Sequence, residues 1–305
     1  MITVPKYLKP GDTIGIVCPA GYMDKEKAVT CVQVLQNWGF RVQTGLTLGG
    51  SSANYFSGTD TERLQDLQRM LDDDNIDAVL CGRGGYGTSR IIDALDLTKF
   101  RKHPKWVIGF SDITALHAHI YRNCKIATLH APMAAAFNGQ GYANEYVGSL
   151  RNALEGKPAH YAVSPHDFNV PGEVSAPLVG GNLSVIVHLL GTDSELKTKN
   201  RILFLEDVGE QLYSIDRMML QLRRTGKLDR VAGLIVGGFT DLKDTERPFG
   251  KTVMEIIHGH LQDYNYPIAF GFPVSHDKEN VALKIGVGYT LKVTHEGVTL
   301  TEIPL

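Results

Sequence analysis

A serine, a glutamate and a histidine each follow a short apolar segment in this 305-residue chain. Ser111 comes after residues 106–108 and Gly109, and residues 112–120 then show helical periodicity, so the local order is strand, tight turn, serine, helix. At a helix N-terminus, free N–H groups and the helix dipole favour negative charge. Acyl-transfer enzymes hold a nucleophilic serine on such a turn, although the second glycine of their Gly-x-Ser-x-Gly motif is absent here. Ser111 is therefore a candidate nucleophile, with a plain helix N-cap as the alternative.

A serine hydroxyl is a weak nucleophile until a base removes its proton, and that base is usually a histidine oriented by a carboxylate. Glu206 ends the apolar strand 202–205, and His276 lies in a loop after the apolar segment 267–270. Taken alone, Glu206 fits a cap or a surface ion pair equally well, and His276 fits a solvated loop residue. His130, which precedes Ala131-Pro132, is a competing histidine.

Two glycine-rich turns also follow predicted strands. In Gly82-Arg-Gly-Gly-Tyr-Gly87, glycines would let backbone N–H groups approach an oxyanion or a phosphate. The spacing matches a dinucleotide-binding fingerprint, but the turn follows a later strand than that motif requires. The second turn, Gly180-Gly-Asn-Leu-Ser184, fits a helix N-terminus capped by Asn182. Either turn is also compatible with a simple connection between a strand and a helix.

Composition limits the classes of function. The chain is 43% hydrophobic and 21% charged with a net charge of −2, and it has no basic block, so nucleic acid is not expected as a partner. No apolar run approaches the ~18–20 residues that span a bilayer, and residues 1–10 lack the apolar core of a secretion signal. The four cysteines are widely spaced, which favours a reducing compartment and predicts a cytoplasmic protein without membrane association.

Metal chemistry lacks ligands at suitable spacing. There is no His-Glu-x-x-His motif and no paired Cys-x-x-Cys. His117 and His119 are two residues apart on a predicted helix, so they point to different faces. The sequence therefore predicts no metal site.

The order of elements predicts an α/β fold. Strands and helices alternate in the first half, which indicates a mostly parallel sheet with helices on both faces, and ligands of such sheets bind beyond the carboxyl ends of the strands. We expect a flavodoxin-like N-terminal domain over 1–152, a linker over 153–175, and a smaller, β-rich α/β domain over 176–305. Within the first domain, helix 61–72 should turn Leu64, Leu67 and Leu71 inward. The segments 282–286, 289–294 and 297–302 are predicted to form a β-meander.

Taken together, the chain resembles the LD-carboxypeptidase family of serine peptidases, also called muramoyltetrapeptide carboxypeptidases. The resemblance covers nearly the whole chain in the family's order. Its six matching motifs are Gly11-Asp-Thr-Ile-Gly-Ile-Val17, Arg83-Gly-Gly-Tyr-Gly87, Gly109-Phe-Ser-Asp-Ile-Thr114, Gly180-Gly-Asn-Leu-Ser184, Leu205-Glu-Asp-Val-Gly-Glu210 and Gly271-Phe-Pro-Val-Ser-His276.

The resemblance implies a triad of Ser111 as nucleophile, His276 as base and Glu206 as its orienter. It also implies an oxyanion hole formed by backbone N–H groups of Gly85 and Asp112, in a crevice between the two domains. The implied reaction removes the terminal D-alanine of a cytoplasmic murein tetrapeptide, an L,D bond, during peptidoglycan recycling. No metal or cofactor is implied, and family members usually form homodimers.

Three residues are candidates for contact with a murein peptide: Arg83, Tyr86 and Asn182. Arg83 would bind the terminal carboxylate of the substrate, because guanidinium groups bind carboxylates in bidentate fashion. A surface ion pair or a helix cap is an equally good explanation of this arginine.

The chain departs from the resemblance before the histidine, where Ser275 occupies a position that is commonly glycine. Two other functions stay open. A related branch of the family hydrolyses antibiotic peptidyl-adenylates, and residues 240–249 are a candidate for its specificity contacts. A non-catalytic module that binds a nucleotide or an anion in its glycine turns would need none of the three candidate catalytic side chains.

Overall fold

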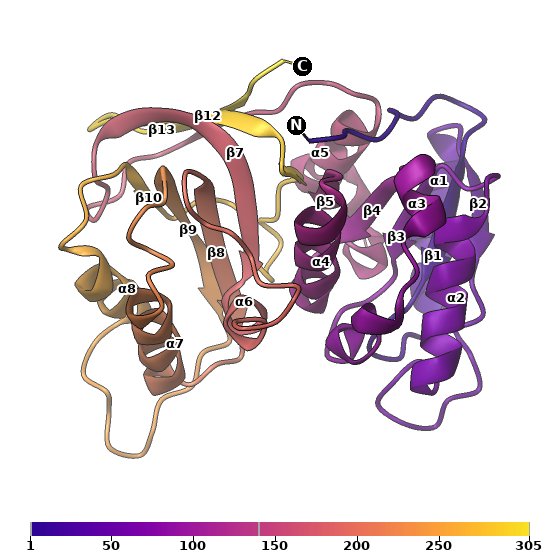
Figure 1. Ribbon diagram of the computed structural model, residues 1–305, viewed down its shortest axis with the longest axis horizontal. Helices are drawn as coiled ribbons and strands as arrows, with labels where there is room; N and C mark the ends of the chain where they lie inside the picture. The colour runs from indigo at the N-terminus through magenta and orange to yellow at the C-terminus, as the bar shows by residue number, and fades with distance from the viewer. Residues whose placement is uncertain (1, 140, 305) are drawn as a thin grey trace. The chain divides into compact units, whose positions relative to one another are not determined.

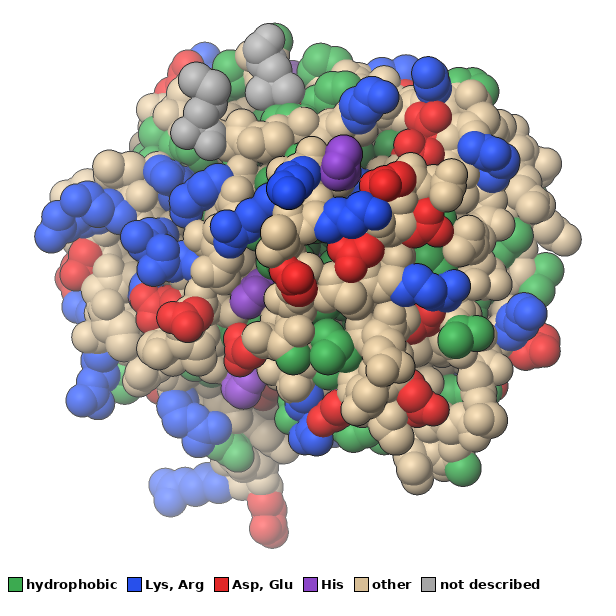
Figure 2. Space-filling model, turned by 45° about the vertical axis from the view of Figure 1, so that its right-hand side comes forward, with side chains coloured by type: hydrophobic (Ala, Val, Ile, Leu, Met, Phe, Trp, Pro, Cys, Tyr) green, Lys and Arg blue, Asp and Glu red, His purple; other side chains and the backbone are tan. Residues whose placement is uncertain are grey.

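The computed structural model describes residues 2–139 and 141–304, which divide into two compact units (Figure 1). The first unit contains the residues up to Lys157 together with Val281–Gly286, and the second contains Pro158–Asn280 and the residues from Val287 onward. In this part of the chain, no helix is both long and apolar enough to cross a bilayer. Basic and acidic side chains are interspersed over much of the face drawn in Figure 2. The expected α/β fold is confirmed.

The first unit is built on a six-stranded sheet in the described residues, with the order β11-β5-β4-β3-β1-β2. All neighbours are parallel except β11, which pairs antiparallel with β5. The order of the parallel strands is that of flavodoxin-like sheets. The strands are β1 (Thr13–Val17), β2 (Arg41–Thr44), β3 (Ala78–Cys81), β4 (Trp106–Gly109), β5 (Thr128–His130) and β11 (Leu283–Ile285).

Right-handed crossovers distribute the helices of this unit over both faces of the sheet. The connection from β1 to β2 runs opposite to the later ones, so α1 lies on one face and α2, α3 and α4 on the other (Figure 1). The helices are α1 (Val29–Asn37), α2 (Asp60–Asp72), α3 (Thr98–Lys102), α4 (Thr114–Cys124) and α5 (Glu145–Leu154). Because strand order reverses between β1 and β3, the loops after these two strands flank the edge where such folds bind ligands.

Helix α2 differs in detail from the prediction. It begins with a capping box in which the Thr59 hydroxyl accepts from the N–H of Glu62 and the Glu62 carboxylate accepts from the N–H of Thr59. Its buried face contains Leu67 and Leu71 as expected, but Leu64 is only half-buried and Arg63 is fully buried. Arginine was not expected there because a charge is buried only when its donors find partners.

The second unit is built on a seven-stranded sheet in the described residues, with the order β10-β9-β8-β7-β12-β13-β6. The strands from β10 to β7 are parallel, and those from β7 to β6 are antiparallel. The strands are β6 (His160–Val163), β7 (Gly172–Asn182), β8 (Ile202–Val208), β9 (Gly233–Thr240), β10 (Ile268–Phe270), β12 (Gly288–Val293) and β13 (Val298–Glu302). The helices are α6 (Leu183–His188), α7 (Leu212–Arg224) and α8 (Val253–Leu261), and α7 packs against α8.

The C-terminal meander is only partly correct. Strands β12 and β13 form the expected antiparallel pair, but β11 joins the sheet of the first unit, where all three of its residues are buried. A three-residue strand that is buried on both faces lacks the alternation that would mark a meander strand. The stretch 153–175, predicted as a linker, includes β6, and the predicted domain limits stay a prediction.

Gly180 in β7 lies unusually close to the neighbouring strand β8. A Cβ atom at this position would stand 2.0 Å from the carbonyl oxygen of Phe204, and the residue has φ +146°. Gly180 and Phe204 are paired in neighbouring strands, so neither backbone can move away from the added Cβ atom without breaking the sheet.

We therefore expect Gly180→Ala to lower the free energy of unfolding by more than about 3 kcal/mol. Gly259→Ala is the control in the same unit, because a Cβ there on helix α8 meets nothing within 4 Å. It should stabilise the protein by roughly 0.5–1 kcal/mol. Urea denaturation measures both, and a Gly180→Ala variant as stable as wild type would contradict the close approach.

His117 of α4 fastens the end of β4. It is 1% exposed, and its Nε2–H donates to the carbonyl of Gly109 at 2.8 Å. Its Nδ1 has no hydrogen-bond partner among the described residues. Burial lowers the pKa of His117 from 6.5 to about 4, so the ring is neutral at pH 7.

This lowered pKa makes stability depend on pH. Between pH 6.5 and 4 the unfolded chain binds a proton at His117 that the folded chain does not, so stability falls by about 3 kcal/mol as pH decreases through this window. His117→Gln should remove this part of the pH dependence, measured as unfolding free energies at pH 7 and pH 4.5. The exposed His103 provides the control, and His103→Gln should leave the dependence unchanged. Equal pH dependence in wild type and His117→Gln would show that His117 is not held neutral.

Candidate active site

The turn after β4 holds Ser111 in a strained backbone conformation. Ser111 has φ +63°, a left-handed value that residues other than glycine rarely adopt. Two residues earlier, Gly109 has φ +158°, and a Cβ there would stand 2.9 Å from the side chain of Ile113. Residues Ser111–Ile113 form a short 3-10 turn that continues directly into α4. This sharp strand–turn–helix geometry is that of a nucleophile elbow, even though the second glycine is missing.

The glycine-rich turn after β3 lies directly against Ser111. A Cβ on Gly84 would stand 2.9 Å from the Cβ and 3.1 Å from the Oγ of Ser111, so only glycine fits. The N–H of Gly21 donates to the carbonyl of Gly84 at 3.0 Å and ties this turn to the loop after β1. From the other side, the N–H of Thr88 donates to the buried carboxylate of Asp112 at 2.8 Å. The turn is therefore fixed at one end to the loop after β1 and at the other end to Asp112, next to Ser111.

The two N–H groups predicted for the oxyanion hole belong to this pair of turns. Gly85 has φ +98°, and the position of a Cβ on the preceding Gly84 is 3.4 Å from the amide nitrogen of Asp112. Arg83 and Tyr86 flank these glycines and are both exposed. The Arg83 guanidinium donates to the carbonyl of Tyr22 at 2.9 Å, and the Tyr86 ring lies 6.0 Å from that of Phe56. Both side chains thus lie beside the turn: Arg83 is bonded to the loop after β1, and Tyr86 contacts the ring of Phe56.

Glu206 and His276 form a hydrogen-bonded pair in the second unit, in which the glutamate is buried and the histidine is partly exposed. The Nδ1–H of His276 donates to Oε2 of Glu206 at 2.6 Å, and the glutamate is 0% exposed. Its other oxygen, Oε1, has no hydrogen-bond partner among the described residues. With the proton on Nδ1, Nε2 is the nitrogen that carries the basic lone pair. This is the arrangement that a general base and its orienting carboxylate require.

Close packing against β9 fixes the loop that carries His276. A Cβ on Gly237 would stand 2.2 Å from the carbonyl oxygen of Val274, and one on Gly238 would stand 2.4 Å from the Cβ of Ser275. Ser275 is buried, and its hydroxyl accepts from the N–H of Asp277 and donates to the carbonyl of Glu279, each at 3.0 Å. Ser275, at the position where the resemblance leads us to expect glycine, therefore closes a turn beside His276.

A second buried carboxylate follows Glu206. The pairing of β8 with β9 shifts register between Leu205 and Asp207, with the extra residue in β9, and both Glu206 and Asp207 are buried. Burial, together with the charge of Glu206, raises the pKa of Asp207 to about 7, even though three N–H groups donate to it. An Asp207 that is partly protonated near pH 7 places less negative charge beside the buried Glu206.

The side chain of Asn182 caps a helix and binds a buried carboxylate in the second unit. It is 4% exposed, and its Oδ1 accepts from the N–H of Val185 and caps α6. Its Nδ2 donates to Asp207 at 2.8 Å. A substrate that contacts the Asn182 side chain would have to bind an amide that already makes hydrogen bonds to Val185 and Asp207.

The structure groups the predicted residues into two sets. The first unit holds Ser111, Gly85, Asp112, Arg83 and Tyr86, and the second holds Glu206, His276 and Asn182. Sequence reasoning did not find Asp207 or the buried Arg63. The sequence did contain an indication for Asp207, since it is the second of two consecutive carboxylates at the end of a predicted strand. The sequence contained no such indication for Arg63, because a single arginine on an amphipathic helix is expected to be solvated.

Comparison with known proteins extends over both units. The profile of the LD-carboxypeptidase N-terminal domain matches residues 14–131, and that of the LD-carboxypeptidase C-terminal domain matches residues 175–291. A protein of Bacillus subtilis, named a probable murein peptide carboxypeptidase, is 36% identical over 92% of this chain and 89% of its own length. The microcin C7 self-immunity protein of Escherichia coli is 25% identical over 97% of this chain and 94% of its own length.

A solved structure shares the whole fold. The muramoyltetrapeptide carboxypeptidase from Oxalobacter formigenes aligns with a TM-score of 0.87 at 24% identity and covers 96% of this chain and 99% of its own. At that identity the similarity establishes architecture, while the sequence profiles and the relative from Bacillus establish descent. The chain therefore belongs to the LD-carboxypeptidase family of serine peptidases, and it is a hydrolase.

Proposed function

We propose that this protein removes the terminal D-alanine from murein tetrapeptides by cleaving the bond between an L-configured centre and D-alanine. The observation that carries the proposal is the hydrogen bond from the partly exposed His276 to the buried Glu206, which would prepare a base for a serine nucleophile. Family membership and the printed name of the relative from Bacillus supply the substrate class. Recycling of murein fragments in the cytoplasm, by a homodimer, is part of the same proposal.

In the proposed reaction, Oγ of Ser111 attacks the scissile carbonyl carbon while Nε2 of His276 takes the hydroxyl proton. A C–O bond forms, and the carbonyl oxygen becomes an oxyanion that accepts from the N–H groups of Gly85 and Asp112. Each such donor contributes on the order of 3 kcal/mol to the transition state. The C–N bond then breaks, His276 returns the proton to the leaving amine of D-alanine, and water hydrolyses the acyl-enzyme in the same way.

The strain at Ser111 supports the role of nucleophile. A left-handed serine costs on the order of 1–3 kcal/mol and persists only where the surrounding structure holds it. Here that support comes from Gly84, His117 and Asp112. In the proposal, Arg83 binds the terminal carboxylate of the substrate, and Tyr86 and Asn182 make further contacts.

Hydrolysis of an antibiotic peptidyl-adenylate is the second candidate function, favoured by the similarity to the microcin C7 self-immunity protein over nearly the whole chain. Both reactions would use the same triad, so substrate comparison distinguishes them.

The first test is mass spectrometry of purified murein tetrapeptide incubated with wild type and with Ser111→Ala. Wild type should remove one alanine, and the variant should not, because it lacks the nucleophile. Loss of alanine with both proteins would exclude the serine mechanism. Activity of wild type on a peptidyl-adenylate alone would favour the second function, and activity on neither substrate would favour a binding module.

The second test is Glu206→Gln, which keeps the size of the side chain but removes its charge. We expect kcat to fall roughly 10³–10⁴-fold, because an amide does not stabilise the imidazolium or select the tautomer. Glu173→Gln is the control, since Glu173 is an exposed carboxylate paired with Lys292 in the same unit. Steady-state kinetics on the tetrapeptide measures both, and similar kcat values for the two variants would contradict the role of Glu206.

A further inference from the structure

Arg63 occupies an unusual position for an arginine. Among residues 2–139 and 141–304, it is the one arginine that is fully buried, at 0% exposure. It lies in the first turns of α2, and its guanidinium reaches toward the carboxyl ends of β1 and β3, where the strand order of the sheet reverses. A guanidinium carries five N–H donors in a rigid planar fork and cannot lose its charge in a protein, so its partners are held in fixed directions.

The partners of this fork are backbone carbonyls from three loops. Its Nη1–H groups donate to Pro19 at 2.5 Å, in the loop after β1, and to Gly87 at 2.9 Å, in the turn after β3. The Nε–H donates to Gly58 at 3.3 Å, in the loop before α2. The Gly87 carbonyl also accepts from the backbone N–H of Arg90 at 3.2 Å, and the Arg63 fork adds the bond that connects it to the loop after β1.

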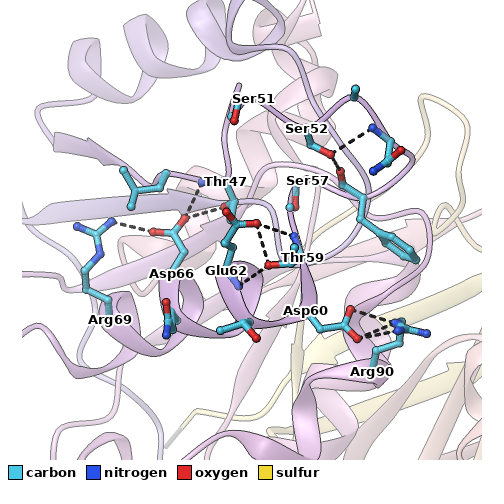
Figure 3. Close-up of a pocket in the computed structure, with 18 residues that line it drawn as sticks. Thr47, Ser51, Ser52, Ser57, Thr59, Asp60, Glu62, Asp66, Arg69 and Arg90 are labelled. Carbon is cyan, nitrogen blue, oxygen red and sulfur yellow. Dashed lines mark hydrogen bonds and ion pairs between the residues drawn. The ribbon is translucent and has the colours of Figure 1, made fainter.

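Further contacts fix the guanidinium itself. The Cζ atom of Arg63 lies 4.8 Å from the centre of the Phe56 ring, and Nη2 forms an ion pair with Asp60. Asp60 also binds Arg90 through both carboxylate oxygens, at the wall of an open pocket of about 1020 Å³ (Figure 3). Gly87 leaves room for the fork, because a Cβ there would stand 2.9 Å from Nη1.

The turn that Arg63 holds is the one that lies against the nucleophile. Gly87 ends the stretch that includes Gly84, which contacts Ser111, and Gly85, a proposed oxyanion donor. The next residue, Thr88, donates its N–H to Asp112. A shift of the Gly87 carbonyl therefore moves the N–H groups beside Ser111, and Arg63 is the side chain that sets the position of this carbonyl relative to the loop after β1.

We propose that Arg63 is a positioning residue that aligns the oxyanion-binding turn, residues 84–87, with Ser111. The inference rests on the proposed serine mechanism and extends it to a side chain that does not touch substrate. If the turn is misplaced, the transition state loses stabilisation, while binding of the ground state changes little.

The test uses Arg63→Lys and Arg63→Ala in the full-length chain. Lysine keeps the charge but has no planar fork, and alanine removes both. We expect kcat on the murein tetrapeptide to fall roughly 10–100-fold, with KM within about threefold of wild type. Methylguanidinium added to Arg63→Ala should restore part of kcat, because the ion fits the space that the side chain vacates. Arg69→Ala is the matched control, since Arg69 forms the same kind of ion pair on α2, with Asp66, but is exposed.

A second readout does not depend on the natural substrate. A fluorophosphonate would be attacked by Oγ of Ser111 with loss of fluoride, and its phosphoryl oxygen would use the same N–H donors. The rate of labelling should fall with Arg63→Ala, recover with methylguanidinium and stay unchanged with Arg69→Ala. If wild type is labelled but releases no alanine from the tetrapeptide, the proposed substrate is wrong while the role of Arg63 is still measured.

Three results would overturn the inference. The first is a folded Arg63 variant with kcat and labelling rate within threefold of wild type. The second is a loss of activity that methylguanidinium does not restore. The third is failure of both variants to fold, as seen by circular dichroism, which would make Arg63 a residue of the fold alone.

Discussion

A buried carboxylate is the constraint on which much of the second unit depends. Glu206 has no exposed surface, and an ion taken out of water is costly unless it is paired and hydrogen-bonded. Its partner, His276, comes from a loop rather than from the sheet, so that loop has to be held firmly. The two glycines of β9 let the loop approach its backbone, and the Ser275 hydroxyl closes the turn around the histidine. The register shift between β8 and β9 falls beside Glu206 and Asp207, and its extra residue lies in the stretch of β9 that contains the same two glycines.

The first unit is subject to a different constraint, because it holds Ser111 in a left-handed backbone conformation that is unfavourable for serine. No single contact does this. Gly109 permits the turn, His117 fastens the carbonyl of Gly109, and the glycine-rich turn after β3 fills the space beside the hydroxyl. These supports are either glycines that leave room for a close approach or a buried polar side chain that binds a backbone carbonyl. The strained serine and the Glu206–His276 pair are thus held by two separate sets of supports.

The sequence supplied candidates for those parts of the proposed site that lie at strand ends. Ser111, Glu206 and His276 each follow an apolar run, and the alternation of strands and helices was enough to predict a parallel sheet. The supports were harder to foresee. Whether Arg63 faces solvent or the interior depends on three carbonyls that are 44, 24 and 5 residues away along the chain. Likewise, β11 is too short to show a pattern, and its pairing with β5 is a long-range contact that local periodicity does not encode.

The path of the chain links the two sets of supports. Directly after the loop that carries His276, the chain enters β11, which pairs with His130 of β5, and His130 in turn pairs with Gly109 of β4. Strand β5, which lies beside the strand that ends in the Ser111 turn, is therefore flanked on its other side by β11, a segment from the far end of the sequence. A first unit cut at Lys157 would leave the edge of β5 unpaired and would remove the buried Leu283 and Ile285 from its core. Because of this return, neither unit is a continuous piece of sequence, and the sheet that carries Ser111 is completed by residues that follow His276 in the chain.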